Sequence, residues 1–357
     1  MAATIYDIAK EAKVGIGTVS RVLNNHPNVS PATKSRVMDA ATRLNYHPHP
    51  YARGLARQRT NTILAVVPFY STFFFVEILR GVQAKLSEID CDLILYGMNH
   101  PDQVEDMLKK SSLRLHTEGV LFLSMIMPDS FAKQYADRGI PIVLVDTKHE
   151  SFDSLYVENL RGAYIATNHL IGLGHTRIGL LNANTRSLPA RERLIGFQRA
   201  MEEKNIDIDP HLVKSSTSTS LDGFTYECGY DLMKEFIQMG NNRPTALLVS
   251  SDVQASGALL AMEEAGIRCP EDIAIVGFDD IELAQHLHLT TMRQPLFEMG
   301  RLAASKIEER MRGSKAPVTK TPFVPQLVIR KTCGAKIAHD KHRSVPTVDS
   351  ARAFSES

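Results

Sequence analysis

The sequence has few cysteines, and they lie far apart, at Cys91, Cys228, Cys269 and Cys333. No two of them form a C-x-x-C pair, so neither the ligand spacing of a zinc site nor a disulfide framework is indicated. The chain also lacks a basic-then-apolar leader and any apolar run of about 18 residues. We therefore expect a cytoplasmic protein with no membrane partner and no metal.

Recognisable enzyme motifs are missing as well. The segment from Gly15 to Gly17 looks like the start of a dinucleotide-binding fingerprint, but no strand is expected before it and Ser20 replaces the third glycine. No nucleophile–base pair or phosphate loop appears elsewhere, so we predict no catalytic residues, no cofactor and no enzymatic activity. Two polar pairs lack a third metal ligand at suitable spacing and are interpreted as structural: Asp279 with Asp280, and His286 with His288.

The chain does have an uneven distribution of charge. Its 357 residues carry a net charge of +1, but residues 1–60 hold nine Lys and Arg against three Asp and Glu, and the remainder holds 32 against 37. A basic head on an acidic body indicates that the head, rather than the whole protein, contacts a polyanion. A solvated charged surface is the alternative that charge alone leaves open.

The basic head, residues 1–46, is predicted to contain three helices, the first two joined by a tight turn. Thr4 is the expected N-cap of the first helix, with Asp7 in its first turn, and Ser30 is the expected N-cap of the third. Each helix has one apolar stripe. The stripes are Ile5, Ile8, Ala9 and Ala12; Val19, Val22 and Leu23; and Val37, Ala40, Ala41 and Leu44.

The second helix leaves Ile16, Gly17, Thr18 and Arg21 outside its apolar stripe. A helix that enters the major groove by its first turns presents such positions to base edges. We therefore predict a helix-turn-helix that binds duplex DNA. A three-helix bundle without a ligand is the alternative.

Residues 47–61 are expected to form a hinge. Pro48 and Pro50 oppose a helix before them, and the two helical turns that follow are too short to persist alone in water. A helix would form there against a partner chain and a DNA backbone. Leu55 would then wedge between base steps in the minor groove, or else pack on the body of the protein. The basic residues expected to face phosphates are Arg53, Arg57 and Arg59.

From residue 62, short apolar runs alternate with amphipathic stretches. The runs are continuous, as in strands buried on both faces, and this alternation predicts an α/β body with parallel sheets and two lobes that divide near Asn159. Polar residues 335–357 are predicted to be a disordered tail. The expected strands are residues 63–67, 93–96, 120–123, 142–145, 178–181, 246–249, 273–276 and 323–330, and the expected helices are residues 76–89, 163–171, 194–201, 229–237, 255–265 and 296–311.

Over roughly residues 3–332, the sequence resembles the LacI/GalR family of bacterial transcription regulators. The most specific matching stretches are residues 4–24, Asn28-Val-Ser-Pro-Ala-Thr33 and Tyr51-Ala-Arg-Gly-Leu-Ala56. Motifs of the body agree, among them Phe74-Phe-Val-Glu77, Leu173-Gly-His-Thr-Arg-Ile178, Asp252-Val-Gln-Ala-Ser-Gly257 and Val276-Gly-Phe-Asp-Asp280.

The resemblance implies an all-α helix-turn-helix head, a hinge helix and a periplasmic-binding-protein-like core. The core would have an N-lobe of residues 62–159 and 293–321 and a C-lobe of residues 160–292 and 322–334. The chain would cross between the lobes near Asn159, Met292 and Pro322, and an effector would sit between them. Homodimers of this family grip palindromic operators, and the effector changes lobe closure and thereby DNA affinity.

The family's base-reading positions fall on Ile16, Gly17 and Arg21, and its hinge lever on Leu55. Arg21 suits guanine, through two donors to O6 and N7. Gly15 stands where the family usually has a serine N-cap, a departure that leaves the operator sequence open. The expected DNA-binding residues are Thr4, Tyr6, Ile16, Gly17, Thr18, Ser20, Arg21, Asn24, Arg53, Leu55 and Arg57.

Several polar and aromatic residues follow expected strands, and the carboxyl ends of strands are where open α/β sheets bind ligands. By resemblance, Phe224 matches an aromatic residue that stacks on a sugar or base, and Ser251 a polar contact. Two alternatives are that Arg193 and Asp279 pair with each other across the cleft, and that Arg191 takes the place of Arg193. The expected effector-binding residues are Phe74, Phe75, Asp146, Arg193, Phe224, Ser251 and Asp279, and Phe73 is expected to belong to the core.

The resulting prediction is a homodimeric transcriptional repressor controlled by a sugar-like or nucleoside-like small molecule. One rival is a solute-binding receptor without DNA function. Another is a catabolite-control regulator that responds to a partner protein. An enzyme with an appended DNA-binding head is a third, and no motif in the sequence supports it.

Overall fold

The structure, a computed structural model, describes residues 3–23, 26, 28–46, 60–68, 72–97 and 117–335. The expected hinge helix and the expected tail from residue 336 lie outside these ranges. Within them, no helix is both long and apolar enough to cross a membrane.

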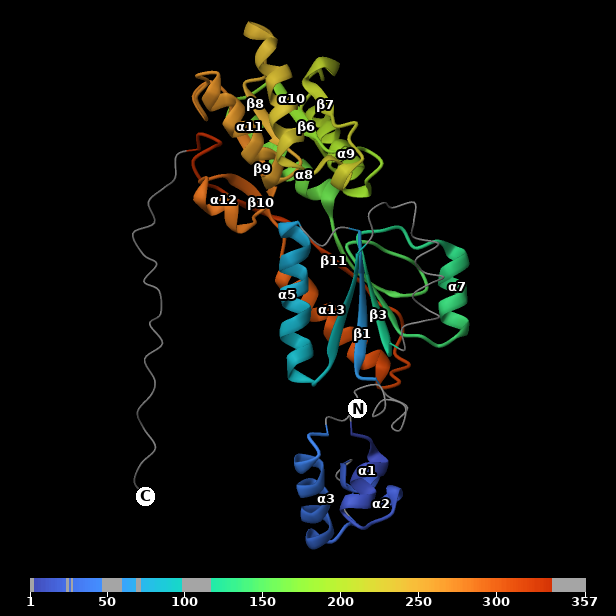
Figure 1. The fold of residues 1–357 in the computed structure, drawn as a ribbon. Helices are drawn as coiled ribbons and strands as arrows, with labels where there is room; N and C mark the ends of the chain where they lie inside the picture. Colours follow the sequence, from blue (N-terminus) through green and yellow to red (C-terminus); the bar gives the residue numbers. More distant parts are fainter. Residues whose placement is uncertain are drawn as a thin grey trace, which may run out of the picture.

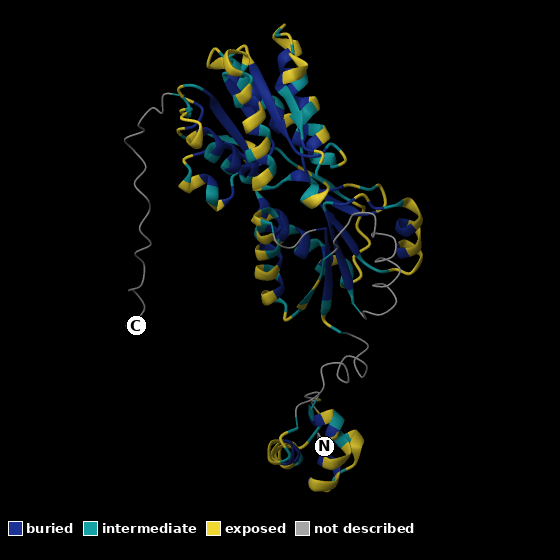
Figure 2. Cartoon of the chain, turned by 45° about the horizontal axis from the view of Figure 1, so that its top comes forward, coloured by how far each residue is buried: buried dark blue, intermediate teal, exposed yellow. Residues whose placement is uncertain are grey.

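The head contains α1 (Ile5–Glu11), α2 (Ile16–Leu23) and α3 (Pro31–Arg43). The predicted N-cap of α1 is confirmed, because the Thr4 amide donates to Asp7 Oδ2 at 2.8 Å and the Asp7 amide donates to Thr4 Oγ1 at 3.4 Å. The apolar stripes of the three helices meet in one small core. The polar surfaces of all three helices therefore remain in solvent (Figure 2).

The first lobe of the body is a six-stranded sheet in the order β11-β5-β4-β3-β1-β2, with helices on both faces (Figure 1). All its pairings are parallel, as the continuous apolar runs predicted. Helices α5 and α13 pack on one face and α7 on the other. The elements are β1 (Thr62–Val67), α5 (Phe73–Glu88), β2 (Asp92–Gly97), β3 (Gly119–Leu123), α7 (Asp129–Asp137), β4 (Ile142–Val145), β5 (Asp153–Val157), α13 (Leu296–Met311) and β11 (Lys320–Phe323).

The second lobe repeats this plan with the strand order β12-β10-β9-β8-β6-β7. Helices α8 and α9 contribute to the core on one face of the sheet, and α10 to α12 to the core on the other. The predicted parallel pairing holds for the other strands of this sheet, and β12 returns antiparallel to β10 at its edge. The elements are α8 (Asn159–Gly172), β6 (Ile178–Asn182), α9 (Leu188–Glu203), β7 (Val213–Ser215), α10 (Tyr226–Gln238), β8 (Ala246–Val249), α11 (Asp252–Glu264), β9 (Ala274–Asp279), α12 (Glu282–His286), β10 (Thr290–Arg293) and β12 (Gln326–Val328).

The chain crosses between the two sheets three times, after β5, after β10 and after β11. The single strand expected over residues 323–330 is wrong. Phe323 ends β11 in the first sheet, and Gln326 begins β12 in the second. Pro325 lies between them and has no amide hydrogen to donate to a sheet, which favours a break at this point.

Neighbouring helices approach each other closely where glycines remove the side chain. A Cβ atom at Gly300 of α13 would lie 1.9 Å from the carbonyl oxygen of Ile78 in α5, and one at Gly81 of α5 would lie 2.0 Å from that of Phe297. The same kind of contact joins α8 to α9 and α10 to α11, through Gly196, Gly229 and Gly257. The backbones of these helix pairs are therefore in direct contact.

We expect Gly300→Ala to lower the free energy of unfolding by about 3 kcal/mol, because the added methyl group forces α5 and α13 apart. Urea unfolding followed by circular dichroism measures this change. The matched control is Gly172→Ala at the end of α8, where an added Cβ meets nothing within 4 Å. That variant should be as stable as the wild type or slightly more so, and equal destabilisation by both substitutions would contradict the packing argument.

Candidate functional site

The face of α2 that the sequence assigned to DNA is open to solvent. Ile16 is 43% exposed, Gly17 and Arg21 are exposed, and Val19 and Val22 on the opposite face are buried. Gly17 and Arg21 are four residues apart and so lie one helical turn from each other. The helix therefore presents Arg21 beside a position without a side chain, where a nucleic acid can approach closely.

The other expected DNA-binding residues divide into three groups. Thr4 and Tyr6 are exposed at the start of α1, and Tyr6 is 67% exposed. Thr18 and Ser20 on α2 are partly buried. The rest lie outside the described residues: Asn24, Arg53, Leu55 and Arg57.

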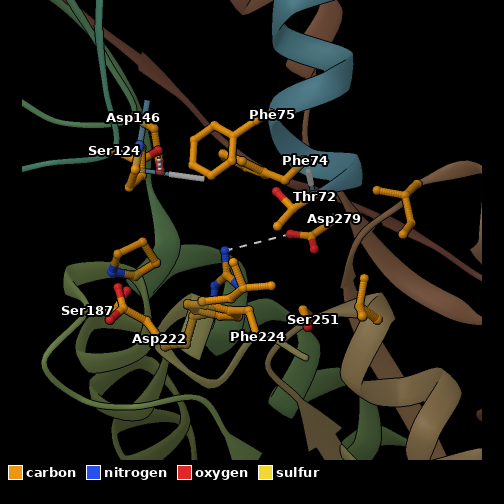
Figure 3. Close-up of a pocket in the computed structure, with 16 residues that line it drawn as sticks. Thr72, Phe74, Phe75, Ser124, Asp146, Ser187, Asp222, Phe224, Ser251 and Asp279 are labelled. Atoms are coloured by element: carbon orange, nitrogen blue, oxygen red, sulfur yellow. Dashed lines mark hydrogen bonds and ion pairs between the residues drawn. The ribbon is translucent and has the colours of Figure 1, made fainter. Parts of the chain in front are cut away.

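A cavity of about 90 Å³ lies between the two lobes (Figure 3). All the effector-binding residues expected from the sequence line it, although their contact with an effector remains a prediction. The first lobe contributes Pro68, Thr72, Phe74, Phe75, Ser124 and Asp146, and the second contributes Ser187, Pro189, Arg193, Leu221, Asp222, Phe224, Ser251, Val253, Asp279 and Ile281.

Aromatic rings flank the cavity from both lobes. Phe75 is buried and Phe74 partly buried, with their ring centroids 5.1 Å apart in an edge-to-face arrangement, while Phe73 is 53% exposed. Phe224 faces them from the second lobe (Figure 3). The first turn of α5 brings both Phe74 and Phe75 to the cavity wall, whereas the expectation that Phe73 belongs to the core is wrong.

Four of the described helices begin at this cavity, and three of them have a hydroxyl residue at the N-cap. Thr72, Ser187 and Ser251 are the N-cap residues of α5, α9 and α11. Ser251 accepts a hydrogen bond from the amide of Gln254, whereas Thr72 and Ser187 make no side-chain cap. The first amides of α5 and α9 and the hydroxyl groups of Thr72 and Ser187 are thus available to a ligand.

Arg193 is almost completely buried at the base of the cavity, where several groups hold its guanidinium. Asn159 Oδ1 accepts from Arg193 Nε at 3.0 Å and from Nη2 at 2.9 Å, and the Ser250 carbonyl accepts from Nη1. The guanidinium also stacks on Phe278, with 3.7 Å between its carbon and the ring centroid. Arg191 is exposed and is not among the residues that line this cavity, whereas Arg193 is.

Asp279 lies at the end of β9, in the same lobe as Arg193. Arg193 Nη2 and Asp279 Oδ1 are 3.9 Å apart, which is an ion pair but too long for a hydrogen bond. The alternative that Arg193 and Asp279 pair with each other is therefore confirmed, but the pair lies within the second lobe and does not span the cleft. Burial raises the pKa of Asp279 to about 7, although the positive charge of Arg193 and the hydrogen bond from Gln294 oppose the rise.

Asp146 stands opposite, at the end of β4 in the first lobe. Ser124 Oγ donates to Asp146 Oδ2 at 2.7 Å. Burial raises the pKa of Asp146 to about 6, an effect that the Ser124 hydrogen bond partly offsets. The neighbouring aspartate Asp280 accepts from Arg293 Nε and Arg330 Nη2, both at 2.6 Å, which agrees with a structural role for that residue.

Asp222 is the clearest ligand candidate that the sequence analysis missed. It lies on the cavity wall in a loop where Leu221, Asp222 and Gly223 all have positive φ, at 47°, 50° and 78°. A leucine in this left-handed region is strained, and such strain often marks a segment that positions ligand contacts. The only sequence signal was an isolated Asp-Gly pair, which usually indicates an ordinary turn.

The raised pKa of Asp279 predicts how stability depends on pH. In the unfolded chain an aspartate has a pKa near 3.9, so between about pH 4 and 7 the folded state binds more protons than the unfolded state. Stability contributed by protonated Asp279 is present at low pH and is lost as the pH rises through this window. The free energy of unfolding should therefore fall with a slope of at most about 1.4 kcal/mol per pH unit from this group.

Urea unfolding at several pH values between about 5 and 8 tests this sign. The Asp279→Asn variant should have a flatter profile than the wild type. The control is Asp272→Asn, because the Arg268 side chain and backbone lower the pKa of Asp272 to about 2, outside this window. The same slope in the wild type and in Asp279→Asn would contradict the prediction.

Comparison with known proteins agrees with this architecture. Residues 4–49 match the model of bacterial regulatory proteins of the lacI family, and residues 167–333 match a periplasmic binding protein-like domain. The chain is 32% identical to the HTH-type transcriptional regulator DegA of Bacillus subtilis, over 92% of this chain and 98% of DegA. It is also 32% identical to the HTH-type transcriptional repressor CytR of Escherichia coli, over 92% of this chain and 96% of CytR.

Two solved structures share the fold over nearly the whole chain. A complex of the transcriptional regulator CelR with cellobiose superposes with a TM-score of 0.68 at 29% identity, covering 92% of this chain and 99% of that one. A lac repressor dimer bound to its operator and an anti-inducer superposes with a TM-score of 0.81 at 24% identity, covering 94% and 100% of the two chains. The second likeness concerns the fold alone.

Proposed function

The chain belongs to the LacI family of bacterial transcriptional regulators, and on that premise we propose that it is a repressor whose operator affinity is set by a small molecule bound between its lobes. The observation that carries the proposal is the combination of two surfaces in one chain. An exposed recognition face with Arg21 lies on the head, and a cavity with Arg193 and Asp279 lies between the lobes. An operator would bind at the first surface and an effector at the second.

The chemistry of the cavity favours a sugar-like or nucleoside-like effector. Phe74, Phe75 and Phe224 offer apolar faces on which a sugar ring or a base can stack. Arg193, Asp146 and Asp279 offer charged donors and acceptors for hydroxyl or amide groups. A compact polar ring fits this combination better than a fatty acid or an extended peptide.

The proposed protein is a homodimer, because a palindromic operator matches a twofold axis. We expect the protein to be located in the bacterial cytoplasm and to associate with the nucleoid when it is bound to its operator. The related proteins DegA and CytR support the role in transcription, since they are named an HTH-type transcriptional regulator and an HTH-type transcriptional repressor.

The test has two arms on the purified full-length protein. Selection from a random duplex library should yield a palindromic sequence that binds far more tightly than a scrambled duplex. A thermal-shift panel of sugars, nucleosides and phosphorylated metabolites should yield a compound that raises the melting temperature and changes operator affinity. A protein that binds a sugar but no DNA would instead be a solute-binding receptor. An operator response that requires a second protein would favour the catabolite-control alternative.

A further inference from the structure

Within the described part of the body, residues 60–68, 72–97 and 117–335, the chain crosses between the two lobes at three points. They lie between β5 and α8, between β10 and α13, and between β11 and β12. Any change in the angle between the lobes must be absorbed at these points, because the sheets on either side are closely packed units. The first two crossings are hydrogen-bonded to Arg193 and Asp279, the charged pair at the base of the cavity.

The first crossing is bonded to Arg193 through Asn159. This asparagine is 3% exposed, and its Oδ1 accepts two hydrogen bonds from the guanidinium, at 3.0 Å and 2.9 Å. Its Nδ2 donates to the carbonyl of Val157 at 3.3 Å, at the end of β5 in the first lobe. Asn159 thus joins the guanidinium in the second lobe to the last residue of a strand in the first lobe.

The second crossing is bonded to Asp279 through Gln294. The amide of Gln294 donates to the Asp279 carbonyl at 3.1 Å, and Gln294 Nε2 donates to Asp279 Oδ1 at 2.5 Å. The next residue, Pro295, is the N-cap of α13 in the first lobe. Gln294 thus joins the Asp279 carboxylate in the second lobe to the residue that begins α13 in the first lobe.

The third crossing, between β11 and β12, packs against Gly162 beside the Phe278 ring. Phe278, on which Arg193 stacks, and Pro325, which lies between β11 and β12, both pack against Gly162 of α8. A Cβ atom at Gly162 would lie 2.7 Å from the Phe278 ring and 2.9 Å from Pro325. The third crossing therefore lies beside Phe278, on which Arg193 stacks, whereas the first two crossings are hydrogen-bonded to the charged pair itself.

We propose that Asn159 and Gln294 are positioning residues that couple occupation of the cavity to the angle between the lobes, and thereby to DNA affinity. The inference rests on the proposed function, since it requires an effector and an operator. A ligand that engages Arg193 and Asp279 shifts the side chains to which the first two crossings are bonded. The response is then carried by two specific amide side chains.

The side-chain oxygen of Gln294 supports the existence of a second side-chain arrangement at the second crossing. Gln294 is 5% exposed, and its Oε1 is buried without a hydrogen-bond partner among the described residues. A buried acceptor without a donor disfavours the arrangement that holds it. A different lobe angle that brings a donor to Gln294 Oε1 would be stabilised accordingly, which makes this crossing a two-state element that a ligand can bias.

The experiment compares operator affinity with and without probe for the wild type and several variants. The operator is the palindrome selected with the wild-type protein, and the probes are cellobiose, D-ribose and adenosine. Asn159→Leu and Gln294→Met remove the proposed coupling bonds, whereas Asn159→Asp keeps the acceptor for Arg193. The matched controls are Asn168→Leu, whose Nδ2 donates to the Tyr164 carbonyl within α8, and Gln285→Met, exposed on α12.

In the wild type, the probe that binds should change operator affinity roughly 5- to 150-fold. Asn159→Leu and Gln294→Met should still bind operator and probe, but the probe should change their operator affinity by no more than about twofold. Asn159→Asp and both controls should respond as the wild type does. Calorimetric titration shows whether each variant still binds the probe, and the melting temperature shows whether it is still folded. A variant that passes both tests but does not respond has lost the coupling.

Two results would overturn the inference. If Gln294→Met and Asn159→Leu respond as strongly as the wild type, the two amides do not carry the signal and only this inference fails. If the wild type binds no operator, or binds an operator whose affinity no probe changes, the proposed function fails and takes the inference with it.

Discussion

Replacement of Arg21 by alanine is expected to abolish the preference for operator over scrambled duplex while leaving weak binding that salt suppresses. Arg21 is exposed on the recognition face of α2, one turn from Gly17. A guanidinium that donates to two acceptors of a guanine contributes about 1–3 kcal/mol of discrimination, and a dimer loses this contribution at both half-sites. The expected loss of operator affinity is thus about 30-fold to well over 1,000-fold.

The weak binding should survive because it comes from phosphate contacts, which do not depend on base sequence. Fluorescence anisotropy with operator and scrambled duplex at several salt concentrations separates the two effects. The matched control is Arg36→Ala, which removes an exposed positive charge from α3 instead. Arg36→Ala should leave the ratio of operator to scrambled affinity intact. A similar loss on both duplexes in Arg21→Ala would show that Arg21 contacts phosphate and reads no base.

Helices and strands whose buried apolar residues form a continuous run or a strictly periodic pattern were predictable from the sequence. The helix over Leu296–Met311 and the strand over Ile142–Val145 have the predicted bounds, because both are flanked by polar or turn residues. The strands β5 and β10 were missed. Asp153 and Thr290 are polar residues buried in these strands, and their partners lie far away in sequence, at Arg310 and Thr332. A local pattern carries no information on such long-range pairs.

The residues of the cavity differ in the same way in how far the sequence predicts them. Asp146 and Asp279 were predictable, because each follows a recognisable apolar strand and the carboxyl ends of parallel strands converge. Asp222 was not, because it belongs to an irregular loop whose positive φ angles arise from tertiary packing. In this loop, a Cβ atom at Gly223 would lie 2.7 Å from Ser216 Oγ, a contact that no sequence spacing predicts.

Exchange of Arg193 for methionine is expected to weaken effector binding about 100-fold or more and to leave the operator complex unresponsive. Methionine keeps much of the apolar volume between Phe224 and Phe278 but removes every donor of the guanidinium. Hydrogen bonds to a charged group contribute about 1.5–3 kcal/mol each, so the loss of two donors to an effector accounts for this factor. Calorimetric titration of the wild-type effector measures it.

Arg191→Met is the matched control, since Arg191 lies on the same helix but is exposed. It should retain effector affinity within about threefold of the wild type. Arg193→Met should also raise the pKa of Asp279 further, because the positive charge of Arg193 opposes the effect of burial on that carboxyl group. Its free energy of unfolding should therefore keep falling with pH beyond the value at which the wild-type curve levels. If Arg193→Met binds the effector as the wild type does, the guanidinium belongs to the crossings between the lobes and makes no contact with the ligand.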